Sequence, residues 1–450
     1  MKLSLHSYIL VLFMYGFWQP FASAQLSKSV EELLYYEQNA IDRSVNRYKM
    51  KHPDIKNQKV EYQPENKQWF NLESAWIPES VLNVAESGIN YAEQFPDEFV
   101  KTENGAKFYR LFIHPESKKF YSKIIKQYGL TTEHTATSTS SSRTVLVKSL
   151  RDPKLVYFVK LSLDITLGGI IRTIPQGEVA RSVGTTKYLT QILKNNSSNF
   201  SFFPEVLGIC PQGFERGGQI IRLIPESLVL NQKHAIPIFA LYAKTDSNPQ
   251  TVLEKMIIKS KTSPADFISS RIIKPFIKEW VHWVVDLDVV MEAHAQNFLM
   301  IVDDSGLPTG EFLHRDFGGF NIDMEALKNR GTHFDFPTFT NLATDYHSRY
   351  SQKAILSSLN IYFSGGVLFN FAKEIKRLDP DFESPKRYLE DVLYQTLENE
   401  LENSTGLKFE NIKNNIRSLP RMIQKAKSHK YNWPEPSTRS FIQRCKDFLY

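Results

Sequence analysis

A predicted hairpin with one lysine inside an apolar strand limits the folds that are open to this chain. The segments 144–147 and 155–163 are rich in β-forming residues, and the turn-forming Arg151-Asp152-Pro153 lies between them, which predicts two antiparallel strands. Lys160 lies inside the second segment, where an unpaired ammonium group is costly to bury. The lysine therefore either reaches water at a sheet edge or meets an anion, such as a nucleotide phosphate.

Patterns along the rest of the chain indicate strands and helices in mixed order. Further strands are expected at 109–113, 202–209, 219–224, 298–302 and 311–314, the last two joined by a turn at 303–306. Helical periodicity is expected over 26–48, 177–195, the long apolar stretch 265–295, and much of the chain after residue 341. The segment 131–142 is rich in Ser and Thr, which is typical of a flexible loop. These patterns predict an α+β protein with a mixed or antiparallel sheet and a helical C-terminal part.

Length, charge and cysteine content exclude several classes of protein. A chain of 450 residues with 42% apolar residues is long enough for two or three domains with a large core. Basic residues exceed acidic ones by six, without a block of like charges that would indicate a nucleic-acid-binding arm. Cys210 and Cys445 lie far apart and outside any CxxC motif, which predicts neither a zinc site nor a disulfide framework, although a single bridge between them stays open.

The N-terminus has the pattern of a secretory signal peptide. Lys2 supplies a minimal charged region, residues 8–18 form a short apolar stretch, and Ala22-Ser23-Ala24 before Gln25 matches a small-residue cleavage site. This pattern predicts a chain exported to the periplasm or secreted, and cytoplasmic if the signal is not used. An uncleaved anchor and a misassigned start codon are the alternatives. No later stretch reaches about 18 apolar residues, so no membrane association is expected after cleavage.

Three separated segments carry polar residues that suit a phosphate-bearing ligand. The hydroxyl-rich segment 138–144 ends in Arg143-Thr144 and offers hydroxyls, backbone N–H groups and a guanidinium to phosphate oxygens, although by itself a solvated loop is the simpler interpretation. The second segment contains Lys160, with Arg172 twelve residues later. A nucleotide phosphate would satisfy the ammonium group of Lys160.

The third segment combines two polar clusters around the predicted hairpin at 298–314. Glu-Ala-His-Ala-Gln-Asn occupies 292–297, at the expected end of the long apolar helix, and His-Arg-Asp-Phe-Gly-Gly-Phe-Asn occupies 314–321. Carboxylate and amide oxygens from Glu292, Asn297 and Asp316 would suit Mg²⁺, a hard cation that prefers oxygen ligands. Helix capping and turn formation are the alternative roles for these residues.

Taken in order, these motifs resemble those of the aerobactin-type siderophore synthetases. The resemblance rests on the serine loop ending in Arg143-Thr144, the pair Lys160 and Arg172, Glu-x-His-x-Gln-Asn at 292–297, Arg-Asp at 315–316, and His-Pro at 114–115. It implies a hand-like fold of thumb, fingers and palm. In that scheme a signal peptide (1–24) precedes a shortened, helical N-terminal region (25–108), a fingers-like β-rich nucleotide-binding region (109–260) and a palm-like helical region with the Mg²⁺ and ATP site (261–450).

The resemblance also implies a role for each motif residue. Ser141, Arg143 and Thr144 would hold the phosphates of ATP, Lys160 and Arg172 would lie near the reacting α-phosphate, His294 and Gln296 would lie beside the nucleotide, and Glu292, Asn297 and Asp316 would bind Mg²⁺. Lys160, Arg172 and His294 are the catalytic residues expected on this basis, with His294 also positioning the carboxylate.

The activity that the resemblance implies is an AMP-forming ligation in siderophore biosynthesis. A citrate-like carboxylate would be activated by ATP as an acyl-adenylate, and an amine or alcohol would then displace AMP. Small-molecule carboxylates and amines or alcohols are thus the expected partners, no nucleic acid is expected, and a homodimer stays open. The substrate motif of the family's longer N-terminal region is not found between residues 25 and 110, so citrate itself is not fixed as the substrate.

Two other classes of function stay open. A protein-kinase-like phosphotransferase would use His314-Arg315-Asp316 with Asn321 as its catalytic loop, Lys160 as its strand lysine, Glu178 as the helix partner of that lysine, and Asp335-Phe336 as a metal-binding motif. Against it, no Gly-rich loop precedes Lys160, and Pro337 stands where that motif has glycine. The remaining class is an exported, non-catalytic homologue that binds a metabolite or a protein.

Overall fold

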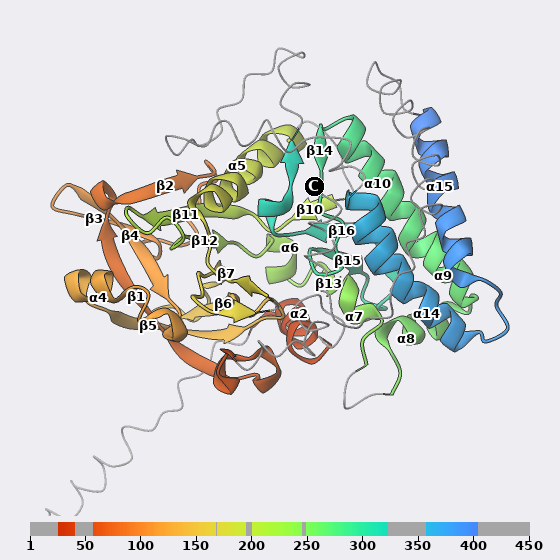
Figure 1. Ribbon diagram of the computed structural model, residues 1–450, viewed down its shortest axis with the longest axis horizontal. Helices are drawn as coiled ribbons and strands as arrows, with labels where there is room; N and C mark the ends of the chain where they lie inside the picture. Colours follow the sequence, from red (N-terminus) through yellow and green to blue (C-terminus); the bar gives the residue numbers. More distant parts are fainter. Residues whose placement is uncertain are drawn as a thin grey trace, which may run out of the picture.

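In the computed structural model, the described residues are 26–40, 57–167, 169–194, 200–244, 249–322 and 357–403. They form a large antiparallel sheet on one side and a helix-rich part around a smaller sheet on the other (Figure 1). The predicted α+β class is confirmed. The predicted signal peptide, Asp335 to Pro337 and Cys445 lie outside the described residues, whereas Cys210 is a free, buried thiol.

The large sheet has nine strands in the order β2-β11-β12-β7-β6-β5-β1-β4-β3, and every neighbouring pair is antiparallel. Its strands are β1 (Trp69–Pro78), β2 (Leu82–Glu86), β3 (Val100–Glu103), β4 (Ala106–Ile113), β5 (Thr131–Ser138), β6 (Thr144–Ser149), β7 (Val156–Lys160), β11 (Glu205–Pro211) and β12 (Gln219–Arg222). The predicted hairpin is confirmed as β6 and β7, with Thr144 opposite Lys160. On its other side Lys160 faces Ile220 of β12, so the lysine lies in an inner strand and cannot reach water along a sheet edge.

Alternation along β7 gives the strand two different faces. Tyr157 and Val159 belong to the apolar core on one side of the sheet, while Phe158 packs with Leu299 and Leu313 of the smaller sheet. Because side chains two residues apart share a face, Lys160 points the same way as Phe158, toward the helix-rich part. The alternation therefore directs the lysine to the junction between the two parts of the molecule.

The smaller sheets lie at this junction and beside it. The four-stranded sheet has the order β10-β16-β15-β13, with β10 parallel to β16. Its strands are β10 (Phe200–Phe202), β13 (His234–Pro237), β15 (Phe298–Val302) and β16 (Pro308–His314); β8 (Thr166–Leu167) pairs with β9 (Ile170–Ile171), and β14 (Val289–Val290) pairs with β17 (Asn321–Ile322). The predicted hairpin at 298–314 is confirmed as β15 and β16.

Helices cover the small sheet and part of the large one. The α-helices are α2 (Lys28–Asn39), α4 (Ser122–Tyr128), α5 (Gln176–Leu193), α6 (Glu226–Val229), α7 (Ile238–Leu241), α8 (Val252–Ser260), α9 (Pro264–Ile268), α10 (Lys274–Val285), α14 (Phe369–Leu378) and α15 (Pro385–Asn403). Short 3₁₀ turns are η3 (Val60–Tyr62), η4 (Pro64–Asn66), η5 (Glu79–Val81), η6 (Pro115–Ser117) and η8 (Phe317–Gly319), and η7 (Ser269–Ile273) and η9 (Ser357–Leu368) are π-helical. The helices predicted at 26–48 and 177–195 are confirmed where residues are described, as α2 and α5.

Three local predictions were wrong. The region 25–108 was expected to be helical, but β1, β2 and β3 lie there and the boundary at 108–109 falls inside β4. The segment 131–138 is strand β5, not a loop, because its alternating β-branched threonines pair with β1 and β6. The long helix expected over 265–295 ends at Val285, and Asp288 then takes a left-handed φ of 60° that ends the helical path.

Helix α5 lies directly on the backbone of the large sheet. A Cβ atom at Gly208 would lie 2.3 Å from Cγ1 of Val179, and one at Gly218 would lie 2.4 Å from Cγ2 of the same side chain. Both distances are too short for any residue larger than glycine at the present separation. This close approach places Glu178, the neighbour of Val179, next to the end of β7.

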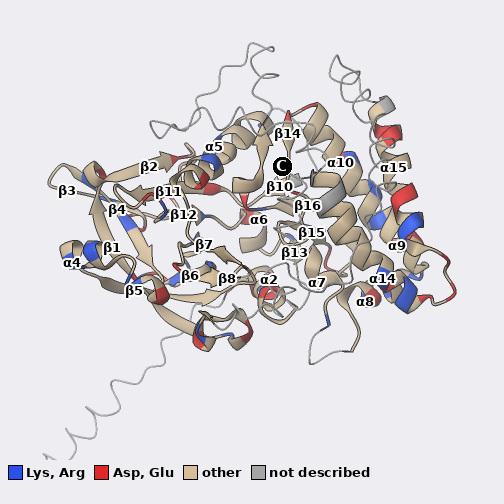
Figure 2. Cartoon of the chain, in the orientation of Figure 1, with Lys and Arg blue, Asp and Glu red and all other residues tan. Residues whose placement is uncertain are grey.

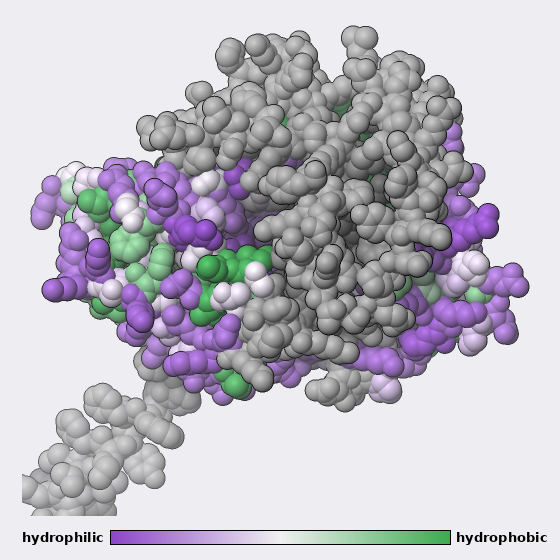
Figure 3. Space-filling model, in the orientation of Figure 1, coloured by the Kyte–Doolittle hydropathy of each residue, from purple (hydrophilic) through white to green (hydrophobic). Residues whose placement is uncertain are grey.

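Apolar and polar side chains are interspersed on the described part of the large sheet. Figure 3 shows hydrophobic areas of limited size among mostly hydrophilic side chains on the described part of the large sheet. Within the described ranges, none of the helices combines the length and hydropathy needed to cross a membrane.

Candidate active site

Lys160 joins the two parts of the fold through ion pairs. Its ammonium group donates to Oε1 of Glu178 on α5 at 2.7 Å and to Oδ1 of Asp316, just after β16. The Lys160 side chain is 1% exposed, so without these partners a charge would remain buried and uncompensated. Figure 2 shows acidic and basic segments close together around α5 and β7.

The serine loop brings a second cation to the same carboxylate. Arg143 donates from Nη2 to Oε1 of Glu178 at 3.0 Å and from Nη1 to the carbonyl of Thr173 at 3.3 Å. The loop is a tight turn between β5 and β6, in which Oγ of Ser141 accepts the N–H of Thr144 at 2.9 Å. Ser141 and Thr144 therefore fix the turn that presents Arg143.

Arg172 adds a third cation beside this cluster. Its Nε donates to the carbonyl of Leu167 at 3.1 Å. Burial and the neighbouring Arg143 lower the pKa of Arg172 to about 10, although Glu178 and Asp316 act in the opposite direction. The guanidinium remains charged at neutral pH, so three cations share two carboxylates, and this surplus of positive charge favours an anionic ligand.

The carboxylates of this cluster are ionised. Burial alone would raise the pKa of Asp316, but Lys160, Arg222 and Arg143 hold it well below the usual range. Burial also opposes ionisation of Glu178, while Arg143 and Lys160 lower its pKa. Nearby positive charges dominate in both cases.

The segment 292–297 folds as a compact turn rather than as the end of a helix. The N–H of His294 donates to the carbonyl of Glu292 at 2.7 Å, and the N–H of Gln296 donates to Nδ1 of His294 at 3.1 Å. Nδ2 of Asn297 donates to Oε2 of Glu292 at 2.8 Å. Two of the three predicted metal ligands, Glu292 and Asn297, are thus in direct contact.

Asp316 approaches this pair through an unusual backbone turn. The residue has a left-handed φ of 71°, uncommon outside glycine, and starts the 3₁₀ turn η8. A Cβ at Gly319 in this turn would lie 2.4 Å from Oε2 of Glu292. The turn therefore packs against Glu292, and the two carboxylates lie on neighbouring segments.

The donor set of Glu292, Asn297 and Asp316 fits Mg²⁺ in its chemistry, since all three residues supply oxygen atoms. Among the described residues there is no group of three or more His, Cys, Asp or Glu side chains that could hold a metal ion. A cation at this position would therefore rely on an amide oxygen and on oxygens of its ligand in addition to the two carboxylates.

Glu37 of α2 is a site residue that the sequence reasoning missed. Its buried carboxylate accepts the N–H and Oγ–H of Ser140 at 3.1 and 2.6 Å, and Nη2 of Arg315 at 2.7 Å. Gln296 completes the network, because its Nε2 donates to Oγ of Ser140 at 3.1 Å and its carbonyl accepts Nε of Arg315 at 2.9 Å. Helix α2 thus ties the serine loop to the segments that carry Gln296 and Asp316.

A signal for Glu37 was present in the sequence. Val30, Leu33 and Glu37 follow helical spacing along one side of α2, so the glutamate occupies a position where an apolar residue is expected. A charged residue on a buried helix face needs a partner. That partner, Arg315, lies too far along the chain to be identified from local pattern.

His314 is buried in an apolar setting immediately before Arg315 and Asp316. Neither ring nitrogen has a hydrogen-bond partner within the described part of the chain, and the ring meets Phe320 edge to face at 4.6 Å between centroids. Burial lowers the pKa of His314 to about 3, although Asp316 raises it. The imidazole is therefore neutral at physiological pH and serves packing.

The fold and these contacts define an α+β protein with a cation-rich site at the junction of its two sheets. The family model described as the IucA / IucC family matches residues 47–243, which confirms the resemblance of this chain to the aerobactin-type synthetases. A second family model, described as ferric iron reductase FhuF-like transporter, matches residues 273–361. That second stretch contains neither cysteine of the chain, so it offers no thiolate to an iron–sulfur cluster.

Solved structures share the fold. The petrobactin biosynthesis protein AsbB of Bacillus anthracis str. Sterne matches with a TM-score of 0.56 at 18% identity, over 79% of this chain and 63% of that one. The ATP-bound aerobactin synthetase IucA of Klebsiella pneumoniae matches with a TM-score of 0.61 at 14% identity, over 79% of this chain and 66% of that one. The aerobactin synthetase IucC of the same organism matches with a TM-score of 0.57 at 16% identity, over 76% of this chain and 64% of that one. This chain thus spans somewhat less than two thirds of each of these proteins, and at such identities the likeness concerns the fold alone. No curated protein matches the sequence.

Proposed function

We propose that this chain is an ATP-dependent, AMP-forming ligase that activates a carboxylate and joins it to an amine or an alcohol. The observation that carries the proposal is the meeting of Arg143, Lys160 and Arg172 with Asp316, beside the contacting pair Glu292 and Asn297. Cations at this density suit a polyphosphate, and the oxygen donors next to them suit its accompanying Mg²⁺.

In the first step, an oxygen of the carboxylate substrate attacks the α-phosphorus of ATP. The bond from that phosphorus to the pyrophosphate oxygen breaks, giving an acyl-adenylate and pyrophosphate. Negative charge develops on phosphate oxygens, so Lys160 and Arg172 would act by electrostatic stabilisation. Ser141, Arg143 and Thr144 would hold the phosphates through the turn that they form.

In the second step, the amine nitrogen or alcohol oxygen attacks the acyl carbon. The bond from that carbon to the AMP oxygen breaks, AMP leaves as its anion, and the nucleophile passes its proton to water. We assign His294 to positioning of the carboxylate and Gln296 to the side of the nucleotide, where its contact with Ser140 would keep it against the serine loop.

Lys160 would donate to a phosphate while it keeps its contacts with Glu178 and Asp316. An ammonium group has three donors, and two of them meet Glu178 and Asp316. In the proposed complex the third would meet a phosphate oxygen. Bound Mg²⁺ would supply charge neutralisation to the phosphates, with Glu292, Asn297 and Asp316 as the residues that hold it.

Siderophore biosynthesis is the biological context that we propose, with a citrate-like substrate. The support is the family match together with the printed roles of the similar structures, a petrobactin biosynthesis protein and aerobactin synthetases. We further propose export through the N-terminal pattern at 1–24.

The test is incubation of the full-length protein with Mg²⁺-ATP, citrate and a panel of polyamines and amino alcohols, with AMP, pyrophosphate and ADP measured separately. We expect AMP and pyrophosphate in equal amounts, dependent on the carboxylate. ADP as the nucleotide product would contradict the ligase and support a phosphotransferase. Absence of Mg²⁺-dependent nucleotide binding would contradict both enzymes and leave a non-catalytic binding protein.

A kinase-like phosphotransferase remains the second candidate because of one specific contact. That interpretation pairs the strand lysine Lys160 with Glu178 on the following helix, and the two side chains form an ion pair of 2.7 Å. It leaves the Glu292, His294, Gln296 and Asn297 segment without a role, which is why the ligase is preferred.

A further inference from the structure

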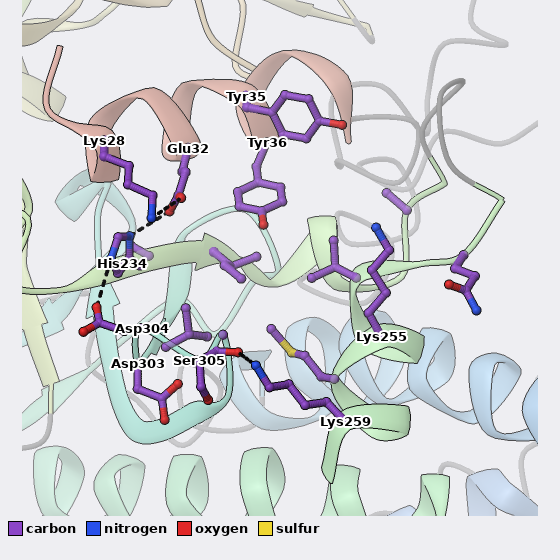
Figure 4. A pocket seen from close by; sticks show the side chains of 18 residues that line it. Lys28, Glu32, Tyr35, Tyr36, His234, Lys255, Lys259, Asp303, Asp304 and Ser305 are labelled. Atoms are coloured by element: carbon purple, nitrogen blue, oxygen red, sulfur yellow. Dashed lines mark hydrogen bonds and ion pairs between the residues drawn. The ribbon is translucent and has the colours of Figure 1, made fainter. Parts of the chain in front are cut away.

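A cavity of about 380 Å³ lies on the face of α2 opposite to Glu37. Its walls are α2, β13, α8 and the turn between β15 and β16 (Figure 4). Lys28, Glu32, Tyr35 and Tyr36 face it from α2, and their helical spacing places them on the other side of the helix axis from Glu37. The cavity is thus separate from the candidate active site, although one helix borders both.

The floor of the cavity is apolar. Ile236, Met256 and Val302 line it and are each about 95% buried, being 4–5% exposed. Volumes of roughly 300–1,000 Å³ with apolar walls and a few polar groups are typical of small-molecule sites. The floor favours a ligand with an apolar body rather than a fully polar one.

Most of the charged groups at the rim are already paired within the protein. Glu32 contacts Nδ1 of His234 at 2.7 Å and Lys28 at 3.8 Å, and Nε2 of His234 lies 3.5 Å from Asp304. On the other side, Lys259 donates to the carbonyl of Ser305. These contacts close the rim without using Lys255 or Tyr36.

Among the described residues at the rim, Lys255 and Tyr36 each have a polar group that could meet a ligand. Within the described residues, neither the ammonium of Lys255 nor the hydroxyl of Tyr36 has a hydrogen-bond or ion-pair partner. Lys255 and Lys259 are one turn apart on α8 and both line the cavity, and of the two Lys259 has a partner, the carbonyl of Ser305. In Figure 4 the two available groups come from α2 and α8, while Asp303 lies toward the opposite side.

We propose that this cavity binds a small monocarboxylate, with its carboxylate between Lys255 and Tyr36 and its apolar part on Ile236 and Met256. A second negative charge is disfavoured, because Glu32, Asp303 and Asp304 also line the cavity. The ligand class therefore differs from the polyanions that suit the candidate active site, and this binding site adds to the proposed ligase reaction rather than forming part of it.

The experiment is calorimetric titration of the full-length protein with three probes of similar body, in the absence of nucleotide. The probes are 3-phenylpropanoate, 3-phenylpropylamine and 2-phenylsuccinate. We expect the monocarboxylate to bind at least tenfold more tightly than the amine and several-fold more tightly than the dicarboxylate. Because ATP and citrate are absent, this outcome does not depend on whether ligase activity is found.

Variants place the binding in this cavity. Lys255→Met is expected to raise the Kd for 3-phenylpropanoate at least tenfold, and Tyr36→Phe about threefold for a lost hydrogen bond. Lys278→Met changes an exposed lysine on α10 that does not line the cavity, and it should leave the Kd unchanged. Equal binding of the amine, an unchanged Kd in Lys255→Met, or no binding of 3-phenylpropanoate would each overturn the proposal.

Discussion

Strand β7 carries two buried polar groups, three residues apart and on opposite faces, and their surroundings differ. The hydroxyl of Tyr157 donates to Glu98 at 2.6 Å, and His134 contacts the same carboxylate at 2.7 Å. Glu98 is 3% exposed in its side chain. At the other end of the strand, Lys160 meets Asp316, whose side chain is 32% exposed.

The cluster around Glu98 is closed by its own neighbours. Arg110 donates to Glu133 at 2.7 Å, to the carbonyl of Glu98 at 2.7 Å and to Ser74 at 3.1 Å, and its guanidinium lies over the ring of Trp76 at 4.2 Å. Each carboxylate there meets donors of the protein. This cluster holds the sheet together, and within the described residues the carboxylates of Glu98 and Glu133 are matched by donors of the protein.

The cluster around Lys160 has a surplus of positive charge and a carboxylate that reaches water. Buried charge by itself is therefore no sign of a functional site, since both clusters have it. What distinguishes the candidate active site is an imbalance between Arg143, Lys160 and Arg172 on one side and two carboxylates on the other, next to solvent.

Lys160→Met is the change expected to show most clearly that the Lys160 cluster serves activity and the Glu98 cluster serves stability. This change removes the cation nearest to the reacting phosphate, and we expect ligase turnover to fall at least about a thousandfold, as for loss of a key electrostatic contact. The thermal midpoint should change little, since the partly exposed Asp316 can be hydrated. Product formation and circular dichroism melting measure the two effects; an unfolded variant would instead make Lys160 structural.

The opposite result, a loss of stability without a loss of activity, is expected from Arg110→Met in the cluster around Glu98. Removal of this fully buried cation takes away the positive charge beside Glu98 and leaves Glu133 with Arg151 alone, so we expect a loss of about 3–5 kcal/mol in the free energy of unfolding. Turnover per folded molecule should be retained. Denaturant titration combined with active-fraction kinetics tests this, and a variant that keeps its stability but loses catalysis would reverse our assignment of the clusters.

The buried histidine His314 should make the free energy of unfolding depend on pH. Unfolded His314 takes up a proton near pH 6.5, but the folded residue does so only near pH 3. As pH falls between these values the unfolded state binds more protons, so stability is lost, by about 2–3 kcal/mol at pH 4.5 for this residue.

The variant His314→Phe should remove this share of the loss and make the stability profile less steep between pH 6.5 and pH 3. His114, which follows β4, has the same lowered pKa, about 3, also through burial, and His114→Phe is the matched variant. Denaturant titrations at several pH values check both. An unchanged profile in His314→Phe would show that this histidine is already protonated when folded.

The smallest effect is expected from Glu37→Gln, which weakens the link between the serine loop and Arg315. Glu37 touches no proposed reacting atom, so we expect the KM for ATP to rise about tenfold, roughly 1.4 kcal/mol, with kcat reduced no more than about threefold. Glu31→Gln changes an exposed acid on the same helix and is the control. A fall in kcat with unchanged KM would place Glu37 in the chemistry instead.

Local pattern was sufficient for the elements whose signals are short-range. The hairpin around residues 151–153, the turn at 303–306 and helix α5 follow from turn residues and periodicity. The segment 131–138 was misinterpreted because Ser and Thr favour loops in isolation, whereas pairing on both sides by β1 and β6 makes a strand of it. Tertiary pairing outweighed composition there.

The candidate site shows the same limit. Arg143, Lys160, Arg172 and Asp316 were predicted from spacing and family resemblance, and the structure brings them together. Glu37 was missed because its partners Ser140 and Arg315 are 103 and 278 residues away in sequence. A contact at that separation leaves no periodic trace that a single sequence can reveal.

Gly208 and Gly218, which lie under α5, determine the position of Glu178 from the sheet side of the helix. A Cβ at Gly208 or Gly218 would lie only 2.3 or 2.4 Å from the Val179 side chain, so an added methyl group would displace Val179 and with it the neighbouring Glu178. A substitution at either position would therefore alter the electrostatics of the site without changing any of its charged residues. Substitutions at these two positions should be poorly tolerated, because each of them would move Glu178.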